Sequence, residues 1–448
     1  LEALGTATYT ADKETYESLR EAAYGAGDRV SDSSPSEYES YVRDEVFSAV
    51  NSAIDAAVPD EYRDAKTRAR VAASLSGRLS EEYTAAVAEE GEIELEGEYW
   101  DGRGFLVRIT DIHETVSGEM TEETNNRIRT TLDDLRTKYE NEVPPSELNP
   151  TAVRLQVLYK GGAGTDDAVI DDETEAIRYM RNAEEVKGHL ESSIRLKSQE
   201  DPDGASLHAG HPTDYMLSLG PAAYAANPDV YERLSEVAYG TGDRVDEESL
   251  DEYESYVRDE VFPAVDASVD AAVPDEYHTT ETQAQVAAAL TGRLMEEYTA
   301  AVTEEGEVEL EGEYWDGRGF LVRITETHES SLGEELSEDT TEDISGALDG
   351  LRSSYEETVP PSELEPAVEE TRTVLTSAEY GETQTGSSDG ETGNDGGAEN
   401  EMDDSETDTE SDSDGNTDTG SESGGQGMPG FTALAALVAL LCAAYLRE

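Results

Sequence analysis

The sequence predicts an α+β fold that is mostly α: a tandem duplicated domain of amphipathic helices with one β-hairpin per copy, then a disordered acidic spacer and a C-terminal apolar helix. Three observations lead to this fold class. Long segments recur almost unchanged later in the chain, and most of each copy shows the apolar spacing of helices. One segment in each copy alternates like a strand instead.

The duplication is visible in two long matches. EYESYVRDEVF at 37–47 returns at 252–262, and EYWDGRGFLVRIT at 98–110 returns at 313–325, an offset of 215 residues in both cases. The repeated unit, at 1–148 in the first copy, is large enough to bury its own core and is too long for a solenoid repeat. The expected organisation is a first copy at 1–148, a connector at 149–215, a second copy at 216–364, a spacer at 365–427 and a terminal segment at 428–448.

Helices are expected wherever apolar residues recur every three or four positions. In the first copy these stripes run over 38–58, over 60–90 with a stop at Gly91, and over 128–139 before a Pro-Pro pair. The connector is expected to contain a helix near 174–198 between two turn-rich ends, Lys160-Gly161-Gly162 and Asp201-Pro202-Asp203-Gly204.

The strand signal lies between the second and third stripes, in EIELEGEYWDGRGFLVRIT at 92–110. Glutamates alternate with apolar residues there, and Asp101-Gly102 is a common turn pair. A three-residue loop at 101–103 keeps the apolar side chains on one face. The resulting register pairs Tyr99 with Phe105, Leu95 with Ile109, and Glu96 with Arg108. Whether the hairpins of the two copies share one sheet or are covered separately by helices stays open.

Acidic residues dominate the composition, with 105 Asp and Glu against 31 Lys and Arg and a formal net charge of −74. Such self-repulsion is tolerated where molar salt screens it, which is typical of a halophilic protein. A chain with no basic face is not expected to bind nucleic acid. The single cysteine, Cys442, excludes an intrachain disulfide. The chain begins at Leu1 rather than Met, as a processed or partial chain would.

Motifs for chemistry are scarce. The sequence contains no phosphate-binding glycine loop, nucleophile elbow or HExxH helix, so we predict no catalytic residue, no cofactor and no metal ligand. His208 and His211 have three-residue spacing, but no helix is expected to align them. His113 and His328 each follow the predicted hairpin and are expected to be loop residues.

Trp100 and Trp315 are the candidate partner contacts of the two copies. The predicted register turns them to the polar face of the hairpin, where an exposed tryptophan could contact a glycan or a protein. The alternative is that each ring covers the glycine opposite, Gly104 or Gly319.

The C-terminal region changes character twice. Residues 381–427 hold 15 acidic residues and no Lys or Arg, a composition that favours an extended, disordered spacer and suits O-linked sugar. Residues 431–446 then carry no charge. As a helix they would span about 24 Å, which predicts membrane insertion.

Pro429, Gly430 and Phe431, followed by an apolar helix and Arg447 and preceded by a Thr/Ser/Asp-rich spacer, resemble the PGF-CTERM sorting signal of haloarchaeal surface proteins. The family usually ends in several basic residues, whereas here Glu448 follows a single Arg447. The resemblance implies export, recognition by an archaeosortase, removal of the tail and attachment to a membrane lipid. An unprocessed tail would remain as a transmembrane anchor with the same topology.

We therefore expect a protein anchored to the cytoplasmic membrane with its bulk at the cell surface. The displayed part is predicted to be a non-enzymatic envelope-structural or binding domain whose two copies give bivalent contact, with a surface-layer protein or a glycan as candidate partner. The alternatives are a surface hydrolase that uses paired carboxylates and a secretion- or pilus-associated component.

Overall fold

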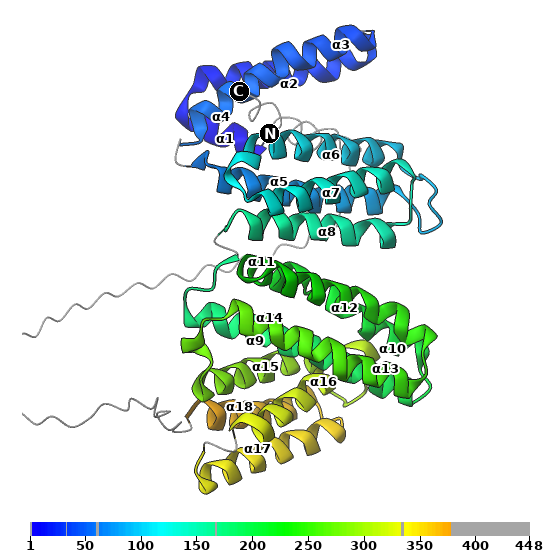
Figure 1. The fold of residues 1–448 in the computed structure, drawn as a ribbon, viewed down its shortest axis with the longest axis vertical. Coiled ribbons are helices and arrows are strands. Elements are labelled where there is room, and N and C mark those ends of the chain that lie inside the picture. Colours follow the sequence, from blue (N-terminus) through cyan, green and yellow to red (C-terminus); the bar gives the residue numbers. More distant parts are fainter. Residues whose placement is uncertain (1, 33, 60–61, 166–167, 333–335, 378–448) are drawn as a thin grey trace, which may run out of the picture.

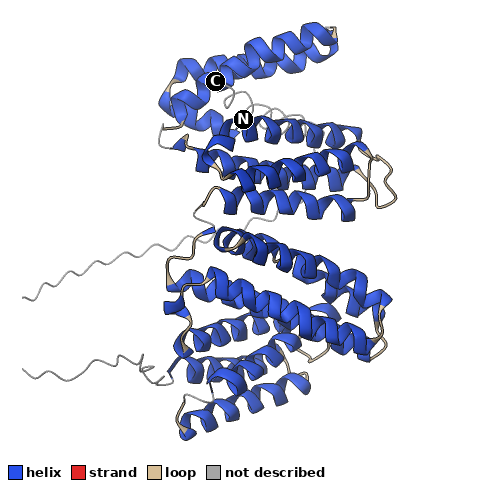
Figure 2. Ribbon diagram, in the orientation of Figure 1, coloured by secondary structure: helices blue, strands red, loops and turns tan. Residues whose placement is uncertain are grey.

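The computed structural model describes residues 2–32, 34–59, 62–165, 168–332 and 336–377. Helices account for nearly all of this part of the chain and stack along the long axis of the molecule, from α1–α4 at one end to α15–α18 at the other (Figure 1). Within the described residues there is no β-strand (Figure 2).

The two copies have the same order of helices. The first contains α1 (Glu2–Ala11), α2 (Lys13–Asp32), α3 (Pro35–Tyr41), the π-helical turn η1 (Val42–Val46), α4 (Phe47–Ala57), α5 (Ala65–Ala86), α6 (Glu96–Val116), η3 (Ser117–Glu119), α7 (Glu122–Glu140) and α8 (Pro145–Gly162). Between the copies lie α9 (Glu173–Ser198), α10 (Pro202–Gly210) and η5 (His211–Thr213).

The second copy repeats the series. It contains α11 (Met216–Ala226), α12 (Pro228–Glu247), α13 (Leu250–Tyr256), η6 (Val257–Val261), α14 (Phe262–Ala272), η7 (Asp275–Tyr277), α15 (Thr280–Ala301), α16 (Glu311–Thr327), η8 (His328–Leu332), α17 (Glu338–Glu356) and α18 (Pro361–Ser377). Both Pro-Pro pairs stop one helix and start the next, since proline is favoured at the first helical position.

The expected helices of the first copy and of the connector are present. The stripe at 38–58 is divided among α3, η1 and α4, and the stripe at 128–139 lies within α7. The connector helix expected near 174–198 is confirmed as α9. A fourth helix, α8 in the first copy and α18 in the second, extends each repeat beyond its VPPSEL segment.

The predicted β-hairpin is wrong in both copies, and with it the α+β fold class, because its residues form α6 and α16. The only extended pairing near it is an isolated bridge between Val87 and Ile93, repeated between Val302 and Val308. Leu95, expected to pair with Ile109, instead stands before the first turn of α6. The fold is all-α.

The reason lies in the residues that α6 buries. Its buried side chains include Tyr99, Phe105, Ile109, Ile112 and Val116, and these recur every three to six positions along one helical face. The alternation that suggested a strand covers only the residues before Tyr99. The buried apolar residues of α6 keep helical spacing over about five turns, whereas apolar and acidic residues alternate over only a few positions before Tyr99. The longer pattern decides the structure, and the segment is helical.

Gly102 serves close packing rather than a turn. A Cβ at this position would lie 2.6 Å from the hydroxyl oxygen of Tyr139, which hydrogen-bonds to the backbone oxygen of Tyr99. Gly317 faces Tyr355 in the same way in the second copy, also at 2.6 Å. The glycine therefore lets the tyrosine of α7 approach the backbone of α6.

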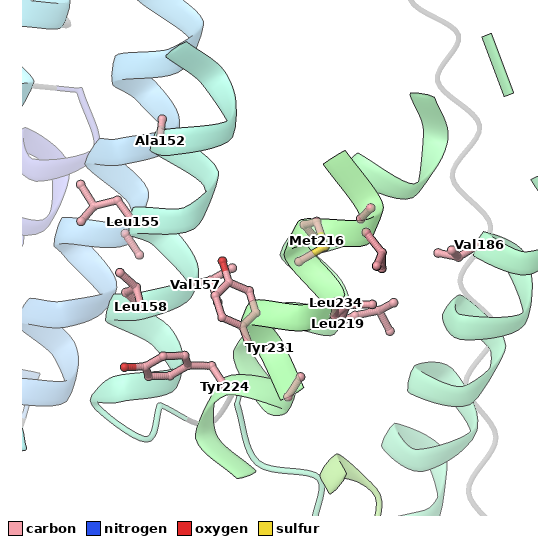
Figure 3. Packing of buried hydrophobic residues seen from close by; sticks show 14 of the residues in the cluster. Ala152, Leu155, Val157, Leu158, Val186, Met216, Leu219, Tyr224, Tyr231 and Leu234 are labelled. Atoms are coloured by element: carbon pink, nitrogen blue, oxygen red, sulfur yellow. The ribbon is translucent and has the colours of Figure 1, made fainter. Parts of the chain in front are cut away.

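A central layer of helices joins the two copies. Helix α8 packs against α11, where Val157 lies beside Tyr231 of α12 (Figure 3). A Cβ on Gly220 would come within 2.8 Å of Val157 and 3.1 Å of Tyr231, so a glycine is required at this contact. The apolar side chains of α5–α8 and of α9–α14 consequently form one continuous core.

Helix α9 is the central helix of the second half. It contacts α10, α14, α15 and α16, and most of its length is buried.

The helices α1–α4 form a separate apolar cluster around Leu19, Val46 and Val50. No helix in the described part of the chain is long and apolar enough to cross a membrane, and the predicted membrane helix at 428–448 lies outside that part.

Two glycines of α6 should respond to substitution in opposite directions. Gly104→Ala has open space and removes a poor helix former, so it should stabilise the fold by up to about 1 kcal/mol. Gly102→Ala should destabilise it by about 1–3 kcal/mol, because the new methyl group meets the Tyr139 hydroxyl. Thermal and denaturant unfolding of the two variants measures both effects. Equal effects of the two substitutions would contradict the helical assignment.

Candidate metal centre

The centre is built where α9 crosses α16. A Cβ on Gly319 would overlap the carbonyl oxygen of Gly188, so the two helices approach at their backbones. His189 follows Gly188 directly, and Asp316 lies one turn before Gly319. The close crossing therefore brings an imidazole of α9 against a carboxylate of α16.

Asp316 is the hub of the cluster. One of its carboxylate oxygens bonds to Nδ1 of His189 and lies 2.7 Å from Nδ1 of His208. The second oxygen lies 3.9 Å from Nε2 of His211. Together, the potential ligand atoms of four residues lie within 4.8 Å of one another. We call this group the His–Asp centre: His189, His208, His211 and Asp316.

Local sequence signals place the two later histidines. Asp201 caps α10 by accepting a hydrogen bond from the Gly204 amide, and Pro202 occupies the first helical turn. His208 lies in the last turn of α10, and His211 opens η5. The expectation that no helix aligns them is wrong, because Asp-Pro here starts a helix rather than marking a turn.

Three of the four residues of the centre are buried. His189, His208 and Asp316 are buried, whereas His211 is partly exposed. An ion would therefore reach the centre past His211. Behind His189, the Nε2 atom lies 3.1 Å from the hydroxyl of Tyr215, which donates a 2.7 Å hydrogen bond to Glu185. Arg181 holds this glutamate at 2.9 Å.

The electrostatics favour a charged carboxylate at Asp316 beside a neutral imidazole at His189. Burial alone would raise the pKa of the Asp316 carboxyl, but hydrogen bonds from His189 and His208 hold that pKa below its ordinary value. Burial lowers the pKa of His189. At His211 the opposing burial effect is overcome by Asp214 and Asp316, which raise its pKa.

These donors fit a divalent transition-metal ion. Three imidazole nitrogens and one carboxylate oxygen are a common set for such ions, and the neutral imidazole is the form that ligates. Nε2 of His208 is buried and has no hydrogen-bond partner among the described residues. The chain from His189 through Tyr215 to Glu185 resembles the outer hydrogen bonds that orient metal-binding histidines.

A pair of glutamates adjoins the centre. Glu297 of α15 and Glu313 of α16 lie with Asp316 in a second group whose potential ligand atoms are within 4.8 Å. Burial and the hydrogen bond to Glu313 raise the pKa of Glu297 to about 7. The two glutamates therefore add carboxylates from α15 and α16 next to Asp316.

The first copy has the same three carboxylates without histidines. Glu82, Glu98 and Asp101 correspond to Glu297, Glu313 and Asp316. Burial raises the pKa of Asp101 to about 6, whereas the same aspartate in the second copy has its pKa lowered by its histidine partners. The histidines come from α9, α10 and η5, which lie between the copies.

Comparison with protein families identifies the bundles that carry these carboxylates. The family model described as the iron permease-associated 4-helix bundle domain matches residues 59–171 and 274–385. The chain belongs to this family. The first match covers α5–α8 and the second covers α15–α18, so each copy contributes one iron permease-associated bundle. Asp316 lies inside the second bundle, and the three histidines lie between the two matched segments.

A second family model, the PGF-CTERM motif, matches residues 428–447. The iron permease-associated bundles are therefore displayed at the cell surface by a haloarchaeal, archaeosortase-sorted protein that is membrane-anchored at its C-terminus. Pro429, Gly430 and Phe431 lie outside the described residues. No curated protein and no solved structure matches the chain.

The other residues singled out from the sequence lie apart from the centre or at its edge. His113 is buried in α6 and His328 in the first turn of η8, so neither is a loop residue. Trp100 is exposed on α6, with the Arg103 guanidinium 5.3 Å from its ring centroid. Trp315 is half-buried and packs against the main core. The role of either tryptophan as a partner contact stays a prediction.

Sequence reasoning missed His189 and Asp316 as site residues. They are distant in the chain, and no short motif joins them. The available signal was local: GH at 188–189 lies on the core-facing side of a strongly periodic helix, where a polar ring requires a partner.

The carboxylate pair of the first bundle should make stability depend on pH. Burial, with a hydrogen bond to Glu98, raises the pKa of Glu82 from 4.5 to about 7. In this range the folded chain holds a proton that the unfolded chain releases, so Glu82 costs stability as pH rises from about 5 to about 7. Glu82→Gln should match the wild type near pH 5 and be more stable near pH 8.

Thermal unfolding across this pH range tests the prediction. The exposed neighbour serves as control, since Glu81→Gln should leave the pH dependence of the unfolding temperature unchanged. Parallel pH profiles for Glu82→Gln and the wild type would contradict the assignment.

Proposed function

We propose that this protein is a surface-displayed binding protein for a divalent transition-metal ion, with iron as the first candidate cargo and the His–Asp centre as its site. The observation that carries the proposal is the convergence of three imidazoles, from α9, α10 and η5, on one buried carboxylate of α16. This convergence joins the connector to a bundle of the iron permease-associated family.

A purely structural hydrogen-bond network is the alternative explanation. Two features favour a metal. First, Nδ1 of His189 and Nδ1 of His208 both approach the same carboxylate oxygen of Asp316, so potential ligand atoms from three elements already converge on one point. Second, three imidazoles share one carboxylate, more rings than a single Asp needs for its own hydrogen bonds. A bound cation could take one nitrogen from each imidazole together with the carboxylate of Asp316.

The donor set narrows the class of ion. Imidazole suits iron, zinc, copper and nickel, whereas calcium and magnesium prefer all-oxygen sites. The absence of thiolate ligands disfavours soft copper(I). The family description names iron permease association, and this makes Fe²⁺ the ion to test first. Zinc binds such donors more tightly than iron in the general affinity series, so it must be measured beside iron.

Surface display and charge suit capture of a cation outside the cell. A net charge of −74 concentrates cations near the surface, although molar salt confines this attraction to a few ångströms. Capture then depends on short-range ligation rather than on long-range steering. Three buried ligands and a partly exposed His211 provide that short-range site. The surface-layer and glycan partners considered from the sequence find no specific support in these features.

Metal binding is the decisive experiment. Wild-type protein in molar salt should bind one Fe²⁺ per chain at the His–Asp centre under anaerobic conditions. Asp316→Asn should weaken binding by more than about tenfold, since it replaces the shared carboxylate. Equilibrium dialysis with elemental analysis, for Fe²⁺ and Zn²⁺ separately, measures stoichiometry and affinity.

The duplication supplies a matched control. Asp101→Asn changes the corresponding carboxylate of the first copy, which has no histidines around it, and should leave this binding unchanged. His211→Ala tests the centre at its most exposed ligand and should weaken binding without unfolding the protein. Equal metal binding by wild type, Asp316→Asn and His211→Ala would overturn the proposal.

Sorting at the C-terminus has its own test. Replacement of Pro429, Gly430 and Phe431 by alanine should prevent processing, because the motif is what the archaeosortase recognises. Mass spectrometry of C-terminal peptides from native membranes should show a wild-type chain that lacks Arg447-Glu448 and carries a lipid-sized mass. The alanine variant should retain its intact terminus. An intact terminus in both proteins would mean an unprocessed membrane anchor.

A further inference from the structure

The two carboxylate oxygens of Asp316 have different neighbours. Oδ1 bonds to Nδ1 of His189 and lies 2.7 Å from Nδ1 of His208. Oδ2 lies 3.9 Å from Nε2 of His211. Because an ionised carboxylate has lone pairs on both oxygens, it can ligate two cations at once. Asp316 can therefore belong to two adjacent metal positions.

A second group of potential ligands meets at the same aspartate. The oxygens of Glu297, Glu313 and Asp316 lie within 4.8 Å of one another, and we call these residues the carboxylate group. Glu313 and Asp316 are three residues apart on α16, so their side chains share one face of that helix. Glu297 comes from α15, which packs against α16. Two helices of the bundle thus direct three carboxylates to one place.

The carboxylate group is not an isolated acidic patch, because it adjoins imidazoles. It shares Asp316 with the three histidines of the His–Asp centre. His211, the partly exposed member of that centre, also lies near the glutamates. Against the effect of burial, the hydrogen bond to Asp214 and the charges of Asp316 and Glu313 raise its pKa. Nitrogen and oxygen donors are therefore available around a second position as well as around the first.

One chain of polar contacts connects the two sides of Asp316. Nη2 of Arg293 lies 2.6 Å from Oε1 of Glu297, and its Nε lies 3.5 Å from Oε1 of Glu185. Glu185 accepts the hydrogen bond of the Tyr215 hydroxyl, which also contacts Nε2 of His189. Contacts of this kind orient the ligands of metal sites. Here they hold Glu297 on one side and His189 on the other.

The contact between the two glutamates also favours a cation. Glu297 and Glu313 form a hydrogen bond with each other, and the side chain of Glu297 is only 13% exposed. Two carboxylates in contact cannot both stay ionised unless a positive charge lies between them. A divalent cation bound by Glu297, Glu313 and Asp316 supplies that charge. Carboxylate ligands suit Mn²⁺, and carboxylates with histidine suit Fe²⁺.

The first copy differs at this point and supplies a control. Glu82 and Glu98 form the corresponding hydrogen bond, and Asp101 corresponds to Asp316. The groups of described residues whose potential ligand atoms lie within 4.8 Å do not include these three. No histidine of α9, α10 or η5 contacts Asp101 in the described part of the chain. A second metal position is therefore expected only in the second copy.

We propose that the carboxylate group binds a second divalent transition-metal ion, with Asp316 bridging it to the ion of the His–Asp centre. The inference rests on the proposed function, because the first ion is half of the pair. Helix bundles bind pairs of metal ions through carboxylates and histidines that project from facing helices. Two ions in such sites lie about 3.5–4 Å apart.

The first test counts the ions that the full chain retains. The protein is loaded with Fe²⁺ in molar salt without oxygen, and loosely held ions are removed by gel filtration before elemental analysis. Wild type should retain about two ions per chain and Glu297→Gln about one, since a glutamine amide is a weaker ligand than a carboxylate. Glu82→Gln, the corresponding change in the first copy, should retain as many ions as wild type. Circular dichroism of the metal-free variants checks that each is folded.

The second test needs no variant and detects whether the two ions are neighbours. Mn²⁺ is added to the wild-type chain, and its electron paramagnetic resonance spectrum is recorded at each step. The first equivalent should give the spectrum of isolated ions, and the second should convert it to that of a spin-coupled pair. Glu297→Gln should show isolated ions at both steps.

The outcomes separate this inference from the proposed function. Equal retention of Fe²⁺ by wild type and Glu297→Gln, or uncoupled Mn²⁺ at two equivalents, would overturn the second position. The His–Asp centre would then hold a single ion, as proposed above. Wild-type protein that retains no Fe²⁺ at all would overturn both proposals.

Discussion

The backbone contact between Gly188 and Gly319 is the constraint on which the second half of the molecule depends. It allows α9 to lie directly on α16, and α9 in turn contacts α10, α14 and α15. The same contact determines which polar groups are buried beside it. Arg323 must pair with Glu184 and Lys187 with Asp266, because a buried charge without a partner is strongly destabilising. The crossing that closes the core is therefore the crossing that assembles the His–Asp centre.

The two copies have similar sequences, yet equivalent aspartates in them have different pKa values because their neighbours differ. Asp101 and Asp316 occupy equivalent positions in nearly identical helices. The first, partly buried near Glu98, has a raised pKa, and the second, bonded to two imidazoles, has a lowered one. The difference comes entirely from α9, α10 and η5, which contact only the second bundle in this way. The connector thus supplies the three histidines of the His–Asp centre, while the two bundles carry matching carboxylates.

Much of the helical architecture could be predicted from the sequence, since duplication and apolar stripes are local signals. The local sequence pattern alone could not exclude the hairpin. Glutamates that alternate with apolar residues before Tyr99 look like a strand, and Asp101-Gly102 looks like a turn. Only the approach of Tyr139 from α7 explains why Gly102 belongs in a helix. Tertiary packing therefore overrode a convincing short-range pattern.

The His–Asp centre shows a different limit of sequence-based prediction. His208 and His211 stood out by spacing, yet their helix was missed because Asp201-Pro202 was interpreted as a turn instead of a cap and first residue. His189 and Asp316 join them only through the crossing of two helices far apart in sequence. Spacing rules detect ligands that one element supplies, and here four elements supply them. A buried polar residue on a periodic helix was the one local indication.

Because of the position of α9, the sequence repeat and the part of the chain that forms the His–Asp centre have different boundaries. The duplicated sequence ends with α8 and begins again at α11, but every ligand of the His–Asp centre lies between α9 and α16. A boundary drawn by sequence similarity would separate the three histidines of the centre from Asp316. A boundary drawn at the loop between α8 and α9 keeps it whole. For grafting this centre into another scaffold, the transferable module is α9–α18, which neither repeat boundary nor family match delimits.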